Sequence, residues 1–104
     1  MEEFEEYLVR LLPRAYDDID ALFRYIAYEV FAPVPADKYV EGIYNIINSL
    51  SYLGGSYAIT QNQYIQKLYG PDARTVVYKK MTIVYRLIGN IVLVQRVMAS
   101  SLIR

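Results

Sequence analysis

The stretch Asp72–Ile88, DARTVVYKKMTIVYRLI, determines how the rest of the chain is interpreted. At 100° per residue, one line of a helix holds only apolar residues: Val77, Met81, Val84 and Ile88. The opposite line holds Thr75, Lys79, Thr82 and Arg86. A strand would instead place Val84, Arg86 and Ile88 on one face, which is a poor alternation. The pattern favours a helix over 72–88 with Asp72 as its N-cap, although β-branched residues disfavour helix.

Helices are also expected in the first half of the chain. A helix that ends or kinks at Pro13 would bury Phe4, Tyr7, Leu8, Leu11 and Leu12. A second helix is expected from about Arg14 to Phe31, before the stiff connector at 32–35. A third is expected from about Ala36 to Leu53, with Gly54-Gly55 as its stop.

The segments that flank 72–88 are shorter. Residues 56–59 suit a very short strand, and Thr60 with Gln63 forms a capping box for a short helix that ends at Gly70-Pro71. After 72–88, Gly89-Asn90 fits either a helix stop or a two-residue hairpin turn. The segment from Ile91 to Val97 is rich in β-branched residues and suits a strand, but it would also make a helical stripe.

This order of elements from Tyr39 to Val97 resembles the winged helix-turn-helix family of DNA-binding domains. The first helix would supply Ile43, Ile46, Ile47 and Leu50, and Tyr57-Ala58-Ile59 would form the first small strand. Residues 60–70 would be the positioning helix, residues 74–81 would open the recognition helix, and Ile91-Val92-Leu93-Val94 would begin the wing. In such folds the outer face of the recognition helix enters the major groove.

The resemblance implies a DNA-binding surface on the basic helix 72–88. Thr75, Lys79, Thr82 and Arg86 would reach base edges and phosphates, and Lys67 and Arg74 would contact phosphates. Tyr78 could stack on bases, and Arg96 would be the charge of the wing. The implied partner is double-stranded DNA, and the implied role is transcriptional regulation or architectural DNA binding.

The chain has no net charge, but its charges are separated along the sequence. Residues 1–41 carry −6, residues 42–66 carry no charged side chain, and residues 67–104 carry +6. Such an asymmetry suggests different partners for the two ends. Alternatively, the acidic helices fold back on the basic part and cancel it, within one molecule or across a dimer.

The composition removes much of enzyme chemistry. Cys and His are absent, so there is no thiol nucleophile, imidazole base or thiolate metal site. The carboxylates Asp17, Asp18 and Asp20 have no spaced partner set and are expected to be solvated surface. We therefore expect no enzyme activity, catalytic residue, metal or cofactor. Abundant Tyr and Ile without Cys would suit a thermophile or one of its viruses.

The sequence thus predicts a mainly α fold: a helix-turn-helix or winged-helix-like core at 36–104, with a small or degenerate β wing. Acidic helices at 1–31 would dimerise the protein or bind a protein partner. The alternative is an all-α bundle with a helix at 90–103, acting as a structural or assembly subunit of a virion or nucleoprotein complex. No stretch reads as a membrane span or secretory signal, so a cytoplasmic protein is expected. The apolar stripes of the two N-terminal helices need a cover, and a homodimer is expected from them.

Overall fold

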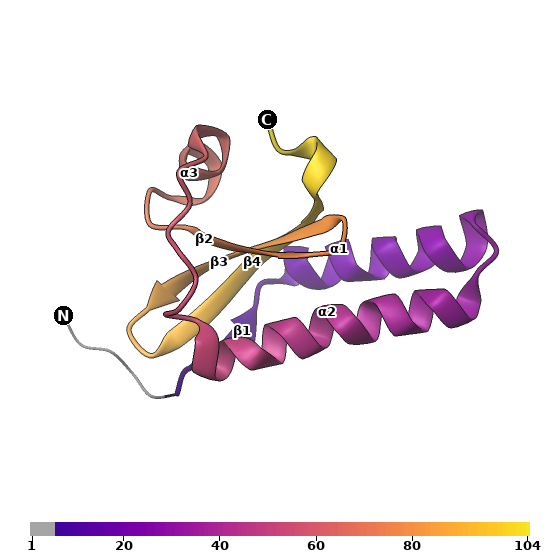
Figure 1. Ribbon diagram of the computed structural model, residues 1–104, viewed down its shortest axis with the longest axis horizontal. Coiled ribbons are helices and arrows are strands. Elements are labelled where there is room, and N and C mark those ends of the chain that lie inside the picture. The colour runs from indigo at the N-terminus through magenta and orange to yellow at the C-terminus, as the bar shows by residue number, and fades with distance from the viewer. Residues whose placement is uncertain (1–5) are drawn as a thin grey trace.

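The computed structural model describes residues 6–104 and shows an α+β fold (Figure 1). A four-stranded mixed sheet has the strand order β1-β4-β3-β2. A long helical hairpin lies against one face of the sheet, and a short helix lies on the opposite side of it (Figure 1). The elements are β1 (Leu8–Leu11), α1 (Pro13–Arg24), the π-helical turn η1 (Tyr25–Glu29), α2 (Pro33–Leu53), α3 (Gln63–Tyr69), β2 (Arg74–Tyr78), β3 (Met81–Ile88), β4 (Ile91–Ala99) and the 3₁₀ turn η2 (Ser100–Leu102).

The predicted helix over 72–88 is wrong, because this stretch is the β2–β3 hairpin. The two strands pair antiparallel from Arg74 opposite Tyr85 to Tyr78 opposite Met81. Lys79 turns the chain with a positive φ of 51°. The sequence of β3 lacks the alternation of polar and apolar residues that marks a half-buried strand. Because β3 is covered on both faces, it is a continuous apolar run. Ile83 and Tyr85 belong to the main core, whereas Val84 belongs to a second cluster with Ile65 of α3.

The C-terminal segment is a strand, which excludes the all-α bundle with its helix at 90–103. The winged-helix core is wrong for another reason, because its recognition helix is the β2–β3 hairpin. Gly89-Asn90 forms the turn of the β3–β4 hairpin, and Gly89 has a φ of 58° that suits glycine. The strand expected for Ile91 to Val97 is confirmed, and β4 continues to Ala99. It is a central strand of the sheet rather than the start of a wing.

The helix predicted for the first twelve residues is also wrong where the structure describes it; Phe4 lies outside the described residues. Leu8–Leu11 form β1, an edge strand that pairs parallel with β4 from Leu8 opposite Ile91 to Leu11 opposite Val94. Tyr7, Val9 and Leu11 contribute to the core, whereas Leu8 is exposed. This period of two is that of a strand with one buried face.

The helices predicted around residues 14–31 and 36–53 are confirmed with shifted ends. α1 and η1 together cover residues 13–29, and α2 begins at Pro33, where proline is tolerated in the first turn. Their predicted apolar stripes pack inward at Ile19, Ile43, Ile47 and Leu50. The boundary predicted between 1–31 and 36–104 falls at the tip of this hairpin, and residues on both sides of it share one core.

The predicted short helix after residue 60 is α3, and its cap differs from the expected one. The Asn62 side chain, not that of Thr60, accepts a hydrogen bond from the Ile65 N–H at 3.0 Å. Thr60 instead accepts from the Asn62 N–H at 3.1 Å. The strand expected at 56–59 is reduced to a bridge between Ile59 and Arg74.

A helix and a β-hairpin at 72–88 predict different burial for Val77 and Met81. Both would be buried in a helix, whereas in the hairpin Val77 is 61% exposed and Met81 is 7% exposed. Met81→Ala should lower the free energy of unfolding by about 2–5 kcal/mol. Val77→Ala should change it by less than about 0.5 kcal/mol. Urea denaturation measures the free energy of unfolding of both variants. An equal loss of stability in the two would contradict the hairpin.

A buried hydrogen bond joins the centre of the sheet to the end of α2. The Tyr85 hydroxyl donates to the Gly54 carbonyl oxygen at 2.6 Å, and the Tyr85 side chain is fully buried. Burial raises the pKa of Tyr85 above its ordinary value, because an anionic phenolate would be desolvated there. The neutral phenol is therefore the form that the fold requires.

The raised pKa predicts a loss of stability in alkali. The neutral Tyr85 phenol contributes its full stabilisation below the unfolded-state tyrosine pKa of about 10. This contribution is lost as the pH rises above that value. Compared with Tyr85→Phe, the wild type should lose up to about 1.4 kcal/mol of unfolding free energy per pH unit above that point. At neutral pH, Tyr85→Phe should be less stable by about 1–3 kcal/mol, since the Gly54 carbonyl loses its donor. Parallel pH profiles of the two proteins would contradict this assignment.

Candidate functional site: a groove beside the helical hairpin

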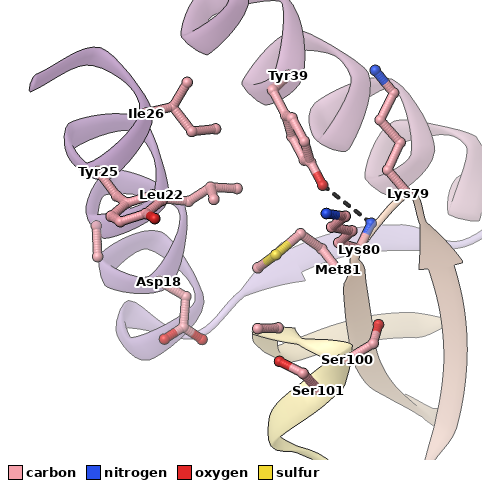
Figure 2. A pocket seen from close by; sticks show the side chains of 12 residues that line it. Asp18, Leu22, Tyr25, Ile26, Tyr39, Lys79, Lys80, Met81, Ser100 and Ser101 are labelled. Carbon is pink, nitrogen blue, oxygen red and sulfur yellow. Dashed lines mark hydrogen bonds between the residues drawn. The ribbon is translucent and has the colours of Figure 1, made fainter. Parts of the chain in front are cut away.

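A groove of about 840 Å³ opens where the helical hairpin passes the end of the sheet (Figure 2). One wall comes from α1 and η1, and the other from Tyr39 of α2 and the β2–β3 turn. Leu22 and Ile26 point across the groove toward Tyr39 and Met81, while Ser100 and Ser101 lie at one end (Figure 2). The lining residues are Asp18, Ala21, Leu22, Tyr25, Ile26, Tyr39, Lys79, Lys80, Met81, Ala99, Ser100 and Ser101.

Two lysines from the β2–β3 turn line one side of the groove, and the Lys79 side chain extends along α2 behind Tyr39 (Figure 2). The Lys79 ammonium lies 5.3 Å from the ring centroid of Tyr39 and 5.5 Å from that of Tyr78, within reach of cation–π attraction. These two rings meet edge to face at 5.5 Å. The Lys80 backbone N–H donates to the Tyr39 hydroxyl at 3.2 Å, which fixes the turn against α2 (Figure 2). Among residues 6–104, neither lysine forms a salt bridge.

The carboxylate that lines the groove is engaged inside the protein. Asp18 accepts hydrogen bonds from Arg96 Nε at 2.7 Å, from Arg96 Nη2 at 3.0 Å and from the Val97 N–H at 2.9 Å. Arg96 also donates to the Tyr69 hydroxyl at 3.0 Å. The bond to Asp18 raises the pKa of the Arg96 guanidinium. Because this pair cancels, the groove keeps the positive charge of its two lysines.

The tip of the helical hairpin is a second exposed surface. Phe31 is 86% exposed and adopts a positive φ of 56°, which is uncommon for a bulky residue. It follows η1, a π-helical turn of the kind that is frequent at functional sites. The exposed apolar residues of this tip are Tyr25, Tyr28, Val30, Phe31 and Val34. Exposed apolar groups gathered in this way are typical of contact surfaces.

The residues predicted to bind DNA do not form one exposed line. Arg74 donates to the Tyr57 carbonyl, and Arg96 is held by Asp18. Arg86 binds Asp72 at 2.9 and 3.2 Å, and this bond lowers the pKa of Asp72. The remaining positions are Lys67 on α3, Thr75 and Tyr78 on β2, Lys79 in the turn, and Thr82 on β3, which is buried and bonded to Ser100.

Of the predicted site residues, only Lys79 lines the groove. The other groove residues share no local sequence pattern, because they come from four separate segments. The sole local signal was the pair Lys79-Lys80 between two apolar runs, which also marks a turn. Within residues 6–104, no helix is long and apolar enough to cross a membrane. The same part of the chain holds no group of acidic side chains suited to a metal ion.

The internal role of Arg96 is tested by removing its partner. The side chains of Arg96 and Asp18 are 19% and 13% exposed, so Asp18→Ala leaves a largely buried charge unpaired. We expect a loss of about 3–5 kcal/mol in the free energy of unfolding. Asp17→Ala, an exposed neighbour, should have little effect. Asp18→Leu combined with Arg96→Met should regain stability relative to Asp18→Ala, and no loss in Asp18→Ala would contradict the assignment.

Comparison with known proteins finds similarity at the level of structure. No protein-family model matches the sequence, and no curated protein matches it significantly. A solved chain described as "Chromosomal ParDE TA system from P. aeruginosa" superposes with a TM-score of 0.74 and 16% sequence identity. The match covers 92% of this chain and 98% of that chain. The two chains share a fold, which is α+β and not a winged helix.

Proposed function

We propose that this protein is the growth-inhibiting member of a toxin–antitoxin pair. The observation that carries the proposal is the structural match, which covers nearly the whole of both chains at a TM-score of 0.74. A match of this extent includes the helical hairpin as well as the sheet. The similar chain is described as belonging to a toxin–antitoxin system, and we extend that role to this protein.

The surface of the protein supports an action through binding to another macromolecule. Tyr28 and Phe31 expose 66% and 86% of their area at the hairpin tip, where aromatic rings could enter a pocket of a target. The groove beside the hairpin offers a second, mainly apolar contact surface. The chain also lacks His and Cys, the commonest general base and the strongest nucleophile. We therefore expect inhibition by binding and not by bond cleavage.

Duplex DNA binding remains a prediction with less support. It depended on the basic outer face of a helix at 72–88, and that helix does not exist. Arg74, Arg86 and Arg96 are bonded to acceptors within the protein. Of the basic residues proposed to contact DNA, Lys67 and Lys79 are the exposed ones, and they belong to α3 and to the β2–β3 turn.

Controlled expression in a bacterial host tests the proposed function. Induction of the wild type should stop growth and reduce colony counts, and co-expression of a reading frame that flanks its gene should restore them. Tyr28→Ala with Phe31→Ala should weaken the arrest, because both side chains are exposed at the tip. Tyr52→Ala is the matched control, since Tyr52 is 68% exposed at the other end of α2.

The outcomes of this experiment are separable. Circular dichroism and immunoblotting should show that all variants fold and accumulate equally. Growth that is unaffected by abundant, folded wild-type protein would contradict the toxin role. Arrest that is equally strong in the tip variant and in the control would keep the toxin role and place the contact surface elsewhere.

A further inference from the structure

We propose that the groove binds the acidic N-terminal arm, residues 2–6, of a second copy of this chain. The two copies would exchange arms and form a homodimer. This proposal goes beyond the toxin–antitoxin role and does not depend on it. It rests on the charge of the arm and groove, on the apolar lining of the groove, and on the distance between the groove and the root of the arm.

The first argument is charge complementarity. The arm has the sequence Glu2-Glu3-Phe4-Glu5-Glu6, with four carboxylates around one aromatic ring. The rim of the groove carries Lys79 and Lys80, which have no acidic partner within residues 6–104. Asp18 does not oppose this attraction, because Arg96 neutralises it. The strongest block of like charge in the chain therefore matches a site of opposite charge.

The second argument is the apolar lining of the groove. Leu22, Ile26 and Met81 face the cavity between the walls, and Tyr25 at its edge is 59% exposed. An aromatic ring placed there would be removed from water by aliphatic groups and would meet other rings edge to face. In the arm, Phe4 is the apolar side chain that the carboxylates flank on both sides. Its ring would enter the groove while the glutamates stay at the basic rim.

The third argument decides between the arm of the same chain and that of a second copy. The root of the arm is fixed, because the Tyr7 N–H donates to the Ser51 carbonyl at 2.6 Å. Along α2, Ser51 lies twelve residues from Tyr39, which corresponds to about 18 Å. Phe4 precedes Tyr7 by three residues, which span at most about 11 Å of extended chain. The arm of the same chain is too short to place Phe4 in the groove.

The sheet gives the same answer. The start of β1 lies beside Ile91, and the groove is lined by Ala99, eight residues further along β4. Eight strand residues correspond to about 26 Å, which again exceeds the reach of Phe4. Two copies related by a two-fold axis, with their α2 helices antiparallel, would bring each arm root near the groove of the other. Such an interface repeats the same contact twice, as closed dimers do.

A charge-swap experiment on the full-length chain tests this proposal. Sedimentation equilibrium should show a wild-type dimer that dissociates as salt is raised, because exposed charges are screened. Reversal of the whole arm, Glu2→Lys, Glu3→Lys, Glu5→Lys and Glu6→Lys, should give a monomer, since arm and groove are then both basic. Lys79→Glu with Lys80→Glu should also be monomeric, since arm and groove are then both acidic. An equimolar mixture of the two variants should form a heterodimer, because both arm–groove contacts are complementary again.

The controls and contrary outcomes follow from the same design. Lys67→Glu changes an exposed lysine away from the groove and should leave the dimer intact. Phe4→Ala should weaken the dimer without changing any charge. A monomeric wild type at all concentrations would overturn the proposal. A dimer that survives both charge reversals, or two monomeric variants that fail to associate when mixed, would equally overturn it.

Discussion

The pairing of β4 on both of its edges is the constraint on which the rest of the structure depends. β1 pairs with it in parallel and β3 pairs with it antiparallel. A strand from the start of the chain therefore lies beside a strand from its end. A parallel neighbour cannot be reached by a tight turn, and the chain must travel away from the sheet and return. The helical hairpin is the first part of this path and packs its apolar stripe onto the sheet. One core therefore includes Tyr7, Ile19, Ile47 and Val94.

The groove is a consequence of a hairpin that extends beyond one end of the sheet it covers (Figure 1). α2 has 21 residues, while the longest strand, β4, has nine. With a rise of about 1.5 Å per helical residue and about 3.3 Å per strand residue, α2 and β4 are nearly equal in length. β2 is shorter, and its turn to β3 ends against Tyr39. The final turns of the hairpin thus have no strand beneath them, and the lysines of the β2–β3 turn lie beside the gap.

The sequence predicted the helices of the hairpin because each has one buried stripe. Ile19, Ile43 and Ile47 recur at helical spacing, and glycine and proline mark the ends. The sheet was harder to predict, because β3 is packed against the hairpin on one face and against α3 on the other. Strands buried on both faces lose their polar alternation, and Asp72–Ile88 then fits a helical wheel by coincidence. β1 is hard to distinguish from a helix in the sequence, because only four residues carry its period of two.

The site could not be predicted for a different reason. Its walls are brought together by tertiary structure, and no more than three of the lining residues are consecutive in the sequence. The arginines chosen as DNA contacts show the same limit: a basic residue in a sequence gives no sign of whether its partner is solvent, a ligand or a distant carboxylate. Asp18 and Arg96 are 78 positions apart, yet they form the least exposed of the three ion pairs in residues 6–104.

The separation of charge along the chain is therefore only partly cancelled within one molecule. Asp18 and Arg96 join the acidic half to the basic half, whereas Arg86 pairs with Asp72 inside the basic half. The acidic arm at 2–6 and the basic turn at Lys79-Lys80 are not compensated in this way by the ion pairs of the described fold. The Asp18–Arg96 pair holds the hairpin on the sheet, and unpaired charges at the surface cost little in water. Those remaining charges are free to direct association with another molecule, and their opposite signs make a second copy a suitable partner.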